Sequence, residues 1–138
     1  MNPEEFLIFK DSPKFNKLRY ELGRVCELEV IETLQEFFKD PSISPLPEGD
    51  SFDFYGKDKK IELKSRSVYR LTYEDTAIGL TKIHHSKSMY GFEDHYYVFK
   101  FVNDLYYWKF TPNCLLRKGS IHGIPHYFIP VLNLINIK

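Results

Sequence analysis

Three residues near the middle of the chain, Asp53, Glu62 and Lys64, are of types that bind metal ions and transfer protons. Glu62 and Lys64 lie two positions apart in the segment Ile61-Glu62-Leu63-Lys64. On a β-strand these two side chains project from one face, while Ile61 and Leu63 point to the other. A carboxylate and an ammonium next to each other on a strand with an apolar opposite face predict that their own face is hydrated or functional.

A hairpin of residues 51–56 and 60–66 around Lys57-Asp58 would bring two carboxylates together. Paired residue numbers would then sum to 115, and Asp53 would lie opposite Glu62 with Cβ atoms roughly 4.5–5.5 Å apart. Two carboxylates at this distance repel, and a bound divalent cation such as Mg²⁺, which prefers oxygen ligands, removes the repulsion. Lys-Asp is a weaker two-residue turn than Asn-Gly, and a slip of one residue would move the carboxylates to opposite faces. The register is therefore a hypothesis.

Length and composition bound the class of protein. The 138 residues, 43% hydrophobic and 28% charged, predict one globular domain over residues 1–138, and the 17% aromatic share predicts a core rich in rings. There is no apolar run of about 18 residues for a membrane span, and the first residues lack the features of a signal peptide. Cys26 and Cys114 form no CxxC pattern, which favours neither a zinc site nor a disulfide framework. An intracellular location is expected.

Charge is distributed unevenly along the chain, although the formal net charge is zero. Residues 51–138 contain thirteen Lys and Arg against eight Asp and Glu, an excess of five positive charges. Such a basic excess is suited to a phosphate backbone. A segregation of charge without function is the alternative.

The pattern of apolar and turn residues predicts a mixed α/β fold, with a mixed central β-sheet flanked by helices. Apolar residues at steps of three and four predict helices, and short β-branched or aromatic runs predict strands. The predicted elements, besides the hairpin, are a helix at 15–39, a loop at 40–50, a helix at 75–87, strands at 96–101 and 105–110, and strand-like runs at 126–131 and 132–137.

Over roughly residues 17–110 this order of elements, together with Asp53 and Glu62-Leu63-Lys64, resembles the PD-(D/E)XK nuclease superfamily. The segment Gly23-Arg24-Val25-Cys26-Glu27 is similar to the glycine-then-glutamate pattern of the archaeal-type Holliday-junction resolvases within it. One departure is that Phe52, and not proline, precedes Asp53. The resemblance implies a restriction-endonuclease-like core of the αβββαβ type.

The resemblance also implies a metal-dependent phosphodiesterase that uses Mg²⁺ or Mn²⁺. Asp53, Glu62 and the main-chain carbonyl of Leu63 would hold the metal, and Glu27 would complete the site from the first helix. Lys64 would orient or deprotonate the attacking water, or stabilise the charge of the transition state.

Further polar residues are candidates for substrate or metal binding. Arg66 continues the face of Glu62 and Lys64 and, like Lys82, is a candidate for substrate binding, with a surface salt bridge as the alternative for Arg66. Asp50 competes with Asp53 for the first carboxylate position. The adjacent His84 and His85 would point about 100° apart on a helix and cannot chelate one metal ion as an i, i+4 pair does.

The function implied by the resemblance is a DNA endonuclease that acts on branched DNA in recombination or repair. Because a four-way junction is two-fold symmetric, a homodimer with two sites is expected. A repair or restriction-type nuclease, an RNA endonuclease of the same fold, and a non-catalytic nucleic-acid-binding or assembly module remain alternatives.

Overall fold

The computed structural model describes residues 17, 29–46, 53–89, 91, 93–113 and 116–137. The chain divides into two compact units, Met1–Lys39 and Asp40–Lys138. In the first unit residue 17 and residues 29–37 are helical, which agrees with this part of the predicted helix, and Val30 and Leu34 are buried. The remainder of that predicted helix lies outside the described residues.

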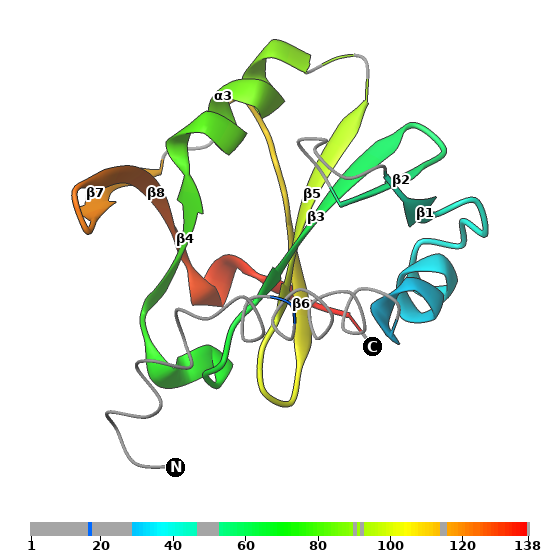
Figure 1. Cartoon of the computed structure of the whole chain (residues 1–138), viewed down its shortest axis with the longest axis horizontal. Coiled ribbons are helices and arrows are strands. Elements are labelled where there is room, and N and C mark those ends of the chain that lie inside the picture. Colours follow the sequence, from blue (N-terminus) through cyan, green and yellow to red (C-terminus); the bar gives the residue numbers. More distant parts are fainter. Residues whose placement is uncertain are drawn as a thin grey trace. The chain divides into compact units, whose positions relative to one another are not determined.

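The described residues of the second unit form two sheets and one α-helix, a mixed α/β architecture as predicted (Figure 1). The larger sheet is mixed, with strand order β1-β2-β3-β5-β6-β9; β3 and β5 are parallel and the other neighbours are antiparallel. The smaller antiparallel sheet has the order β4-β8-β7. The elements are β1 Ser44–Pro45, β2 Phe54–Gly56, β3 Lys59–Ser65, the 3₁₀-helix η1 Arg70–Thr72, β4 Asp75–Gly79, α3 Leu80–Met89, β5 Asp94–Lys100, β6 Leu105–Lys109, β7 Arg117–Ile121, β8 Ile124–Pro130, the 3₁₀-helix η2 Val131–Asn133 and β9 Ile135–Asn136.

The hairpin of β2 and β3 has the predicted register over three pairs, but β2 begins only at Phe54, so the predicted strand pair of Asp53 with Glu62 is not formed. Its paired residues are Phe54 with Ile61, Tyr55 with Lys60 and Gly56 with Lys59, and each pair sums to 115. The loop is the two-residue turn Lys57-Asp58, in which Asp58 takes a φ of 58°. This left-handed conformation is one that Asp tolerates better than most residues.

Asp40 supports this turn from the preceding loop. Its Oδ2 accepts hydrogen bonds from the main-chain N–H of Lys57 at 2.8 Å and from Nζ of Lys59 at 2.7 Å. Hydrogen bonds from Lys59 and from the Ser42 hydroxyl hold the pKa of Asp40 well below its usual range. A Cβ at position 56 would lie 2.6 Å from Asp40 Oδ2, so glycine at 56 allows the carboxylate to approach. A side chain distant from the turn thus compensates for the weak Lys-Asp sequence.

The helix predicted at 75–87 is wrong in its first five residues. Residues 75–79 form β4, which pairs with β8, and α3 begins only at Leu80. Thr76 and Ile78 are buried while their neighbours are partly exposed, the alternation of a strand. The apolar residues that suggested a helix were too few to distinguish the two periods.

The loop predicted at 40–50 is wrong at Ser44–Pro45, which form the short strand β1 paired with β2. The later strands are confirmed in part. The strands predicted at 96–101 and 105–110 correspond to β5 and β6, which form a hairpin. The strand predicted at 126–131 corresponds to β8, which begins two residues earlier. Of the run 132–137 only β9 is a strand, preceded by η2, and β7 was not predicted.

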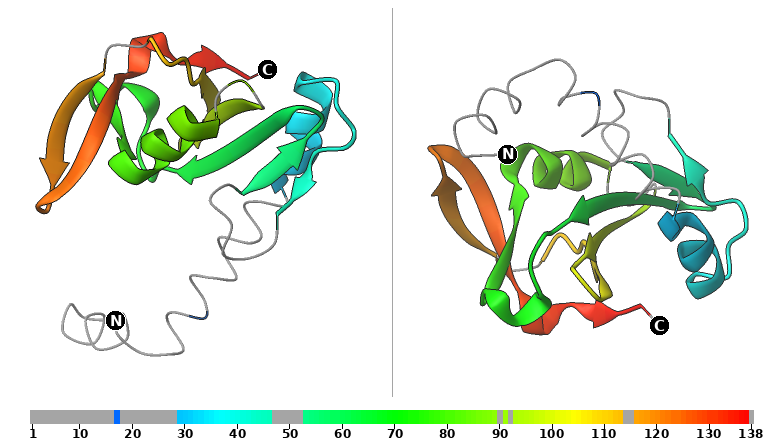
Figure 2. Two further views of the ribbon diagram at one scale, coloured as in Figure 1. Left: turned by 90° about the horizontal axis from the view of Figure 1, so that it is seen from above. Right: turned by 60° about the horizontal axis from the view of Figure 1, so that its bottom comes forward.

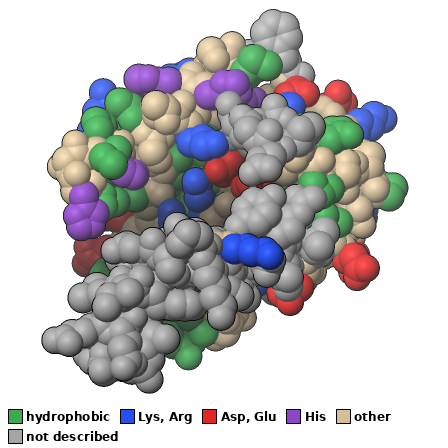
Figure 3. Space-filling model, viewed as in Figure 1, with side chains coloured by type: hydrophobic (Ala, Val, Ile, Leu, Met, Phe, Trp, Pro, Cys, Tyr) green, Lys and Arg blue, Asp and Glu red, His purple; other side chains and the backbone are tan. Residues whose placement is uncertain are grey.

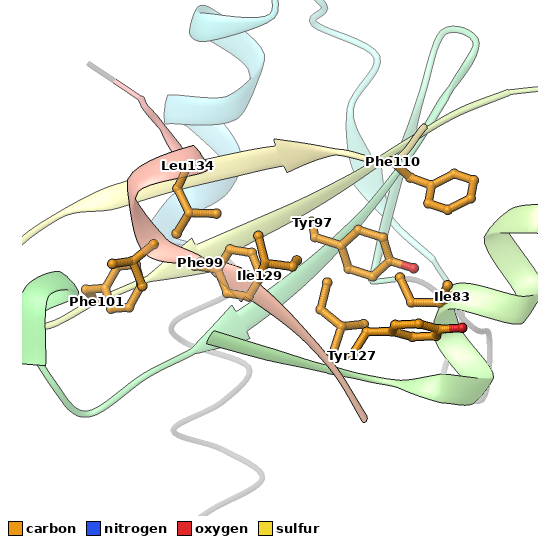
Figure 4. Close-up of a cluster of buried hydrophobic side chains, with 10 residues drawn as sticks. Ile83, Tyr97, Phe99, Phe101, Phe110, Tyr127, Ile129 and Leu134 are labelled. Atoms are coloured by element: carbon orange, nitrogen blue, oxygen red, sulfur yellow. The ribbon is translucent and has the colours of Figure 1, made fainter. Parts of the chain in front are cut away.

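The hydrophobic core of this unit lies between the two sheets and α3 and is rich in aromatic rings, as expected. Figure 4 shows Tyr97 of β5 and Tyr127 of β8 extending toward Ile83 of α3. The small sheet, with β7 and β8 in orange, can be followed beside α3 in Figure 2. The buried members of this cluster are Ile78, Ile83, Tyr97, Phe99, Phe101, Phe110, Tyr127, Ile129, Val131 and Leu134.

Replacing Ile78 by alanine is expected to destabilise the protein by about 2–5 kcal/mol, because a fully buried side chain of β4 would leave a cavity between the sheets. Urea unfolding followed by circular dichroism measures the change. Leu132→Ala is the control, since Leu132 is 79% exposed and its loss should change stability by no more than about 0.5 kcal/mol. Equal effects of the two substitutions would contradict the position of β4 in the core.

Candidate functional site

Glu62, Lys64 and Lys82 form the charged cluster of this protein. Nζ of Lys64 lies 2.9 Å from Glu62 Oε1, and Nζ of Lys82 lies 3.3 Å from Glu62 Oε2. Glu62 is buried, whereas both lysines are partly exposed. On the face of the molecule that Figure 3 presents, basic side chains lie next to acidic ones in a hollow. The cluster places a buried carboxylate under two ammonium groups that solvent and ligands can reach.

Two elements that are separate in the sequence build the cluster. Glu62 and Lys64 project from one face of β3, as the two-residue spacing predicted, and Lys82 comes from the first turn of α3. Ile61, on the other face of β3, is fully buried. The strand is therefore covered on both faces at this point, and the buried carboxylate of Glu62 has an ammonium partner at each oxygen.

Asp53 approaches the charged cluster through the backbone of β3. Its Oδ2 accepts a hydrogen bond from the N–H of Leu63, the residue between Glu62 and Lys64, at 2.7 Å. The main-chain N–H of Asp53 donates to the carbonyl of Ile61 at 3.1 Å, one residue away from the regular pairing of the hairpin. The N–H and C=O of one strand residue point to the same side, so the Leu63 carbonyl is directed to the side of β3 on which Asp53 lies.

A buried hydrogen-bond network joins α3 to β5 beside the charged cluster. The hydroxyl groups of Tyr97 and Ser86 are 2.7 Å apart, and Nδ1 of His95 lies 3.1 Å from Ser86 Oγ. The Tyr97 hydroxyl also donates to the main-chain carbonyl of Lys82 at 3.1 Å. This network fixes the backbone from which the Lys82 side chain extends toward Glu62.

The environment shifts the pKa values of two members of the network. Burial raises the pKa of Tyr97, the negative charge of Glu62 adds to the increase, and the hydrogen bond with Ser86 opposes it. Burial, with smaller contributions from the positive charges of His85 and Lys60, lowers the pKa of His95 to about 4. Tyr97 and His95 are therefore neutral near pH 7.

Arg66 lies at the end of β3 and connects this strand to β4. Its guanidinium donates to the carbonyl of Ala77 at 2.8 Å and to Oγ1 of Thr76 at 3.3 Å, and lies 5.8 Å from the ring centroid of Phe99. Its main-chain N–H donates to the carbonyl of Lys100 at 2.8 Å. The predicted substrate-binding residue thus links the two sheets and also lines a cavity.

The structure brings together most of the candidate residues. Glu62, Lys64 and Lys82 are in contact, Asp53 is bound to the backbone between the first two, and the predicted ligand Glu27 lies outside the described residues. Among the described residues no group of three or more His, Cys, Asp or Glu side chains is arranged to hold a metal ion. The rival residue Asp50 also lies outside the described part of the chain.

Comparisons with protein-family models, with curated proteins and with solved structures give no match to this chain. The resemblance to the PD-(D/E)XK nucleases therefore stays a prediction that rests on the residues themselves. Within the described residues, no helix is both long enough and apolar enough to cross a membrane.

The reading of the sequence did not find the network of Ser86, His95 and Tyr97. The available signal was that Ser86 lies four residues after Lys82, a spacing that places two helical residues on neighbouring turns. That a tyrosine and a histidine of β5 would meet this serine depends on the parallel pairing of β3 with β5, which brings Tyr97 beside Glu62.

His95 predicts a loss of stability in mild acid. The histidine of the unfolded chain takes up a proton near pH 6.5, and the folded one only near pH 4, so the unfolded state binds more protons between these values. The free energy of unfolding should fall as the pH decreases from about 6.5 to about 4, by about 3 kcal/mol at most. Urea unfolding at several pH values measures this slope.

The matched variants are His95→Gln, which removes the buried histidine, and His122→Gln, which removes an exposed histidine. The first should flatten the slope between pH 6.5 and pH 4, and the second should leave it unchanged. An unchanged slope in His95→Gln would show that other groups cause the acid sensitivity.

Proposed function

We propose that this chain is a magnesium-dependent DNA endonuclease that hydrolyses phosphodiester bonds, with a restriction-endonuclease-like core and a preference for branched DNA. The observation that supports this proposal best is the buried carboxylate of Glu62 held between Lys64 and Lys82, with the Asp53 carboxylate bound at Leu63. A solvated strand edge would explain exposed charges but not a buried carboxylate beneath two partly exposed lysines.

The oxygen donors beside β3 fit a hard divalent cation. Asp53, Glu62 and the carbonyl of Leu63 would hold Mg²⁺ or Mn²⁺. When bound, the cation would polarise the scissile phosphate and lower the pKa of the attacking water. Each oxygen of Glu62 has a lysine partner, at 2.9 and 3.3 Å, so a cation bound at Glu62 would repel these ammonium groups and favour the release of one of them.

Charge balance makes metal and DNA binding mutually supportive. Asp53 and Glu62 carry two negative charges, and Lys64 and Lys82 carry two positive ones, so these four groups sum to zero without a metal. A divalent cation added to this set leaves a local excess of two positive charges, which a phosphodiester reduces. A lysine released from Glu62 is then available for a phosphate oxygen.

In this proposal Lys64 acts on the water or on the developing charge, and Lys82 contacts the substrate phosphate. Lys64 is 27% exposed on its side chain and Lys82 28%, so both ammonium groups reach solvent. Arg66 completes the basic face of β3, although its guanidinium also has protein acceptors. The small size of the chain favours recognition of DNA structure through phosphate contacts, and a two-fold symmetric junction would be cut by a homodimer.

The test of the metal site is cleavage by Glu62→Gln and Asp53→Asn. Both substitutions keep the size of the side chain but remove a negative charge, so each should abolish cleavage of branched DNA in Mg²⁺ while the fold and DNA binding persist. Cleavage is followed on a panel of four-way, flap, nicked and linear substrates, with Mg²⁺, Mn²⁺ or EDTA, and folding by circular dichroism.

Glu74→Gln and Asp104→Asn are matched controls, since both residues are exposed and lie outside the charged cluster. They should cleave as the wild type does. Wild-type turnover in Glu62→Gln would refute the metal site, and DNA binding without cleavage under every condition would favour the non-catalytic module. Cleavage restricted to RNA would favour the RNA endonuclease.

Lys64→Ala should slow the chemical step by roughly two orders of magnitude or more, the scale for the loss of one electrostatic stabiliser. Lys64→Arg should recover only part of the rate, because a guanidinium keeps the charge but does not act as a base near neutral pH. Single-turnover cleavage measures both. Lys57→Ala, which removes an exposed cation of the same hairpin, should retain the wild-type rate.

The affinity for Mn²⁺ distinguishes a catalytic Lys64 from a structural one. Removal of a cation next to the carboxylates should leave this affinity unchanged or raise it. If Lys64→Ala instead lost metal binding and thermal stability together, Lys64 would serve only to neutralise Glu62.

A further inference from the structure

A cavity of ≈ 390 Å³ opens at the end of β3, outside the charged cluster. It lies where the segment that follows β3 faces β4 and β8, all within the second unit. Its volume is in the range of small-molecule sites. Its walls combine aromatic rings, arginine side chains and a few hydrogen-bonding groups. Its lining includes Arg66, Tyr69, Arg70, Tyr73, Asp75 and His126.

Two tyrosine rings at this cavity are largely exposed. Tyr69 is 58% exposed and Tyr73 65%, so neither ring serves the hydrophobic core. Phe101 and Phe128 also line the cavity. Exposed rings on both sides of a 3₁₀-helix in a cavity wall offer flat surfaces on which another planar ring can stack.

The cavity offers both acceptors and donors of hydrogen bonds. Asp75 has a partly exposed carboxylate whose Oδ2 accepts a hydrogen bond from Arg117 at 2.9 Å. Nδ1 of His126 lies 2.8 Å from the carbonyl of Ile124 and donates to it, so Nε2 is the ring nitrogen left for a ligand. Arg66 donates to Ala77 at 2.8 Å and Arg70 to Val131 at 3.4 Å, and each guanidinium has further N–H groups. A planar ligand with both donors and acceptors on its edge, as a nucleobase has, matches this lining.

The position of the cavity connects it to the charged cluster. Arg66 directly follows Ser65, the last residue of β3, and its main-chain N–H continues the pairing with β5 at Lys100. At the rise of an extended strand, about 3.3 Å per residue, its backbone lies about 7 Å beyond that of Lys64. Stacked nucleotides of one DNA strand are about 3.4 Å apart along the helix axis, so one or two nucleotides span this distance.

We propose that the cavity binds the base of an unpaired nucleotide next to the phosphate held at the charged cluster. The base would stack on Tyr69 or Tyr73 and donate its amino or imino hydrogens to Asp75 and His126. A base in a duplex cannot enter, since its edge is paired and its faces are stacked. The enzyme would therefore select DNA that offers an unpaired nucleotide near the cleavage position. This inference rests on the proposed function.

Binding of free bases can be tested without cleavage. The full chain, in EDTA, is titrated with the four deoxynucleosides and with phenol as a ring without base edges, and amide shifts are recorded by NMR. We expect saturable shifts in residues 66–77 and 126–128, with at least one nucleoside binding at least tenfold more tightly than phenol. The absence of saturable shifts there, or equal binding of phenol and all nucleosides, would overturn the proposal.

Variants of the exposed tyrosines locate the base. Tyr69→Ala and Tyr73→Ala, singly and together, should weaken nucleoside binding by about 5- to 100-fold, the effect of losing a stacking ring. The phenylalanine variants keep the ring and should bind within about twofold of wild type. Tyr55→Ala removes another exposed tyrosine, on β2 and outside the cavity, and should change nothing. Unchanged binding in the double alanine variant would also overturn the proposal.

Cleavage assays separate this inference from the proposed function. If wild-type protein cleaves substrates with unpaired nucleotides faster than blunt duplex, the double alanine variant should lose that preference while it keeps a basal rate on duplex. Nucleoside binding at the cavity without cleavage of any DNA would refute the endonuclease and keep the base site. Cleavage with no nucleoside binding and an unchanged preference in the variant would refute the base site and keep the endonuclease.

Discussion

The pairing of β2 with β3 brings the Asp53 carboxylate to Leu63, the residue between Glu62 and Lys64. Because side chains alternate along a strand, a slip of one residue in this hairpin would place Asp53 and Glu62 on opposite faces. Asp40 prevents this slip, since its carboxylate binds both Lys57 and Lys59 at the turn. The turn sequence alone would not specify the register. A carboxylate far from the chemistry therefore positions the carboxylates that would carry it out.

The burial of Glu62 imposes the second constraint. A buried carboxylate without partners is strongly destabilising, and Glu62 has one ammonium at each oxygen. One of them comes from α3, so the ion pair between Glu62 and Lys82 requires α3 to lie against β3 and β5. The hydrogen bond from Tyr97 to the carbonyl of Lys82 meets that requirement from the strand side. The charged cluster and the packing of the helix are thus parts of one arrangement.

Whether a feature of the fold or the site could be predicted depends on how far apart in the sequence the interacting residues lie. The face shared by Glu62 and Lys64 and the register that sums to 115 follow from local alternation, and both agree with the structure. The strand β4 does not follow, because Asp75–Gly79 is a strand only through its pairing with β8, some fifty residues later. Likewise, the hydrogen bonds from Arg66 to Thr76 and Ala77 depend on the position of β4 in the smaller sheet.

The second sheet also explains why a charged cluster and an aromatic cavity occur on one strand. Arg66 ends the polar face of β3, and its two hydrogen bonds to β4 hold the small sheet at the same strand end. The segment between β3 and β4 is consequently confined to a short path, which exposes Tyr69 and Tyr73 at the cavity instead of burying them. Because the Arg66 guanidinium is hydrogen-bonded to β4 and also lines the cavity, a shift of one sheet against the other would disturb the cavity. In the proposed function, the distance between the phosphate site and the base site would then depend on the hydrogen bonds that hold β4 at the end of β3.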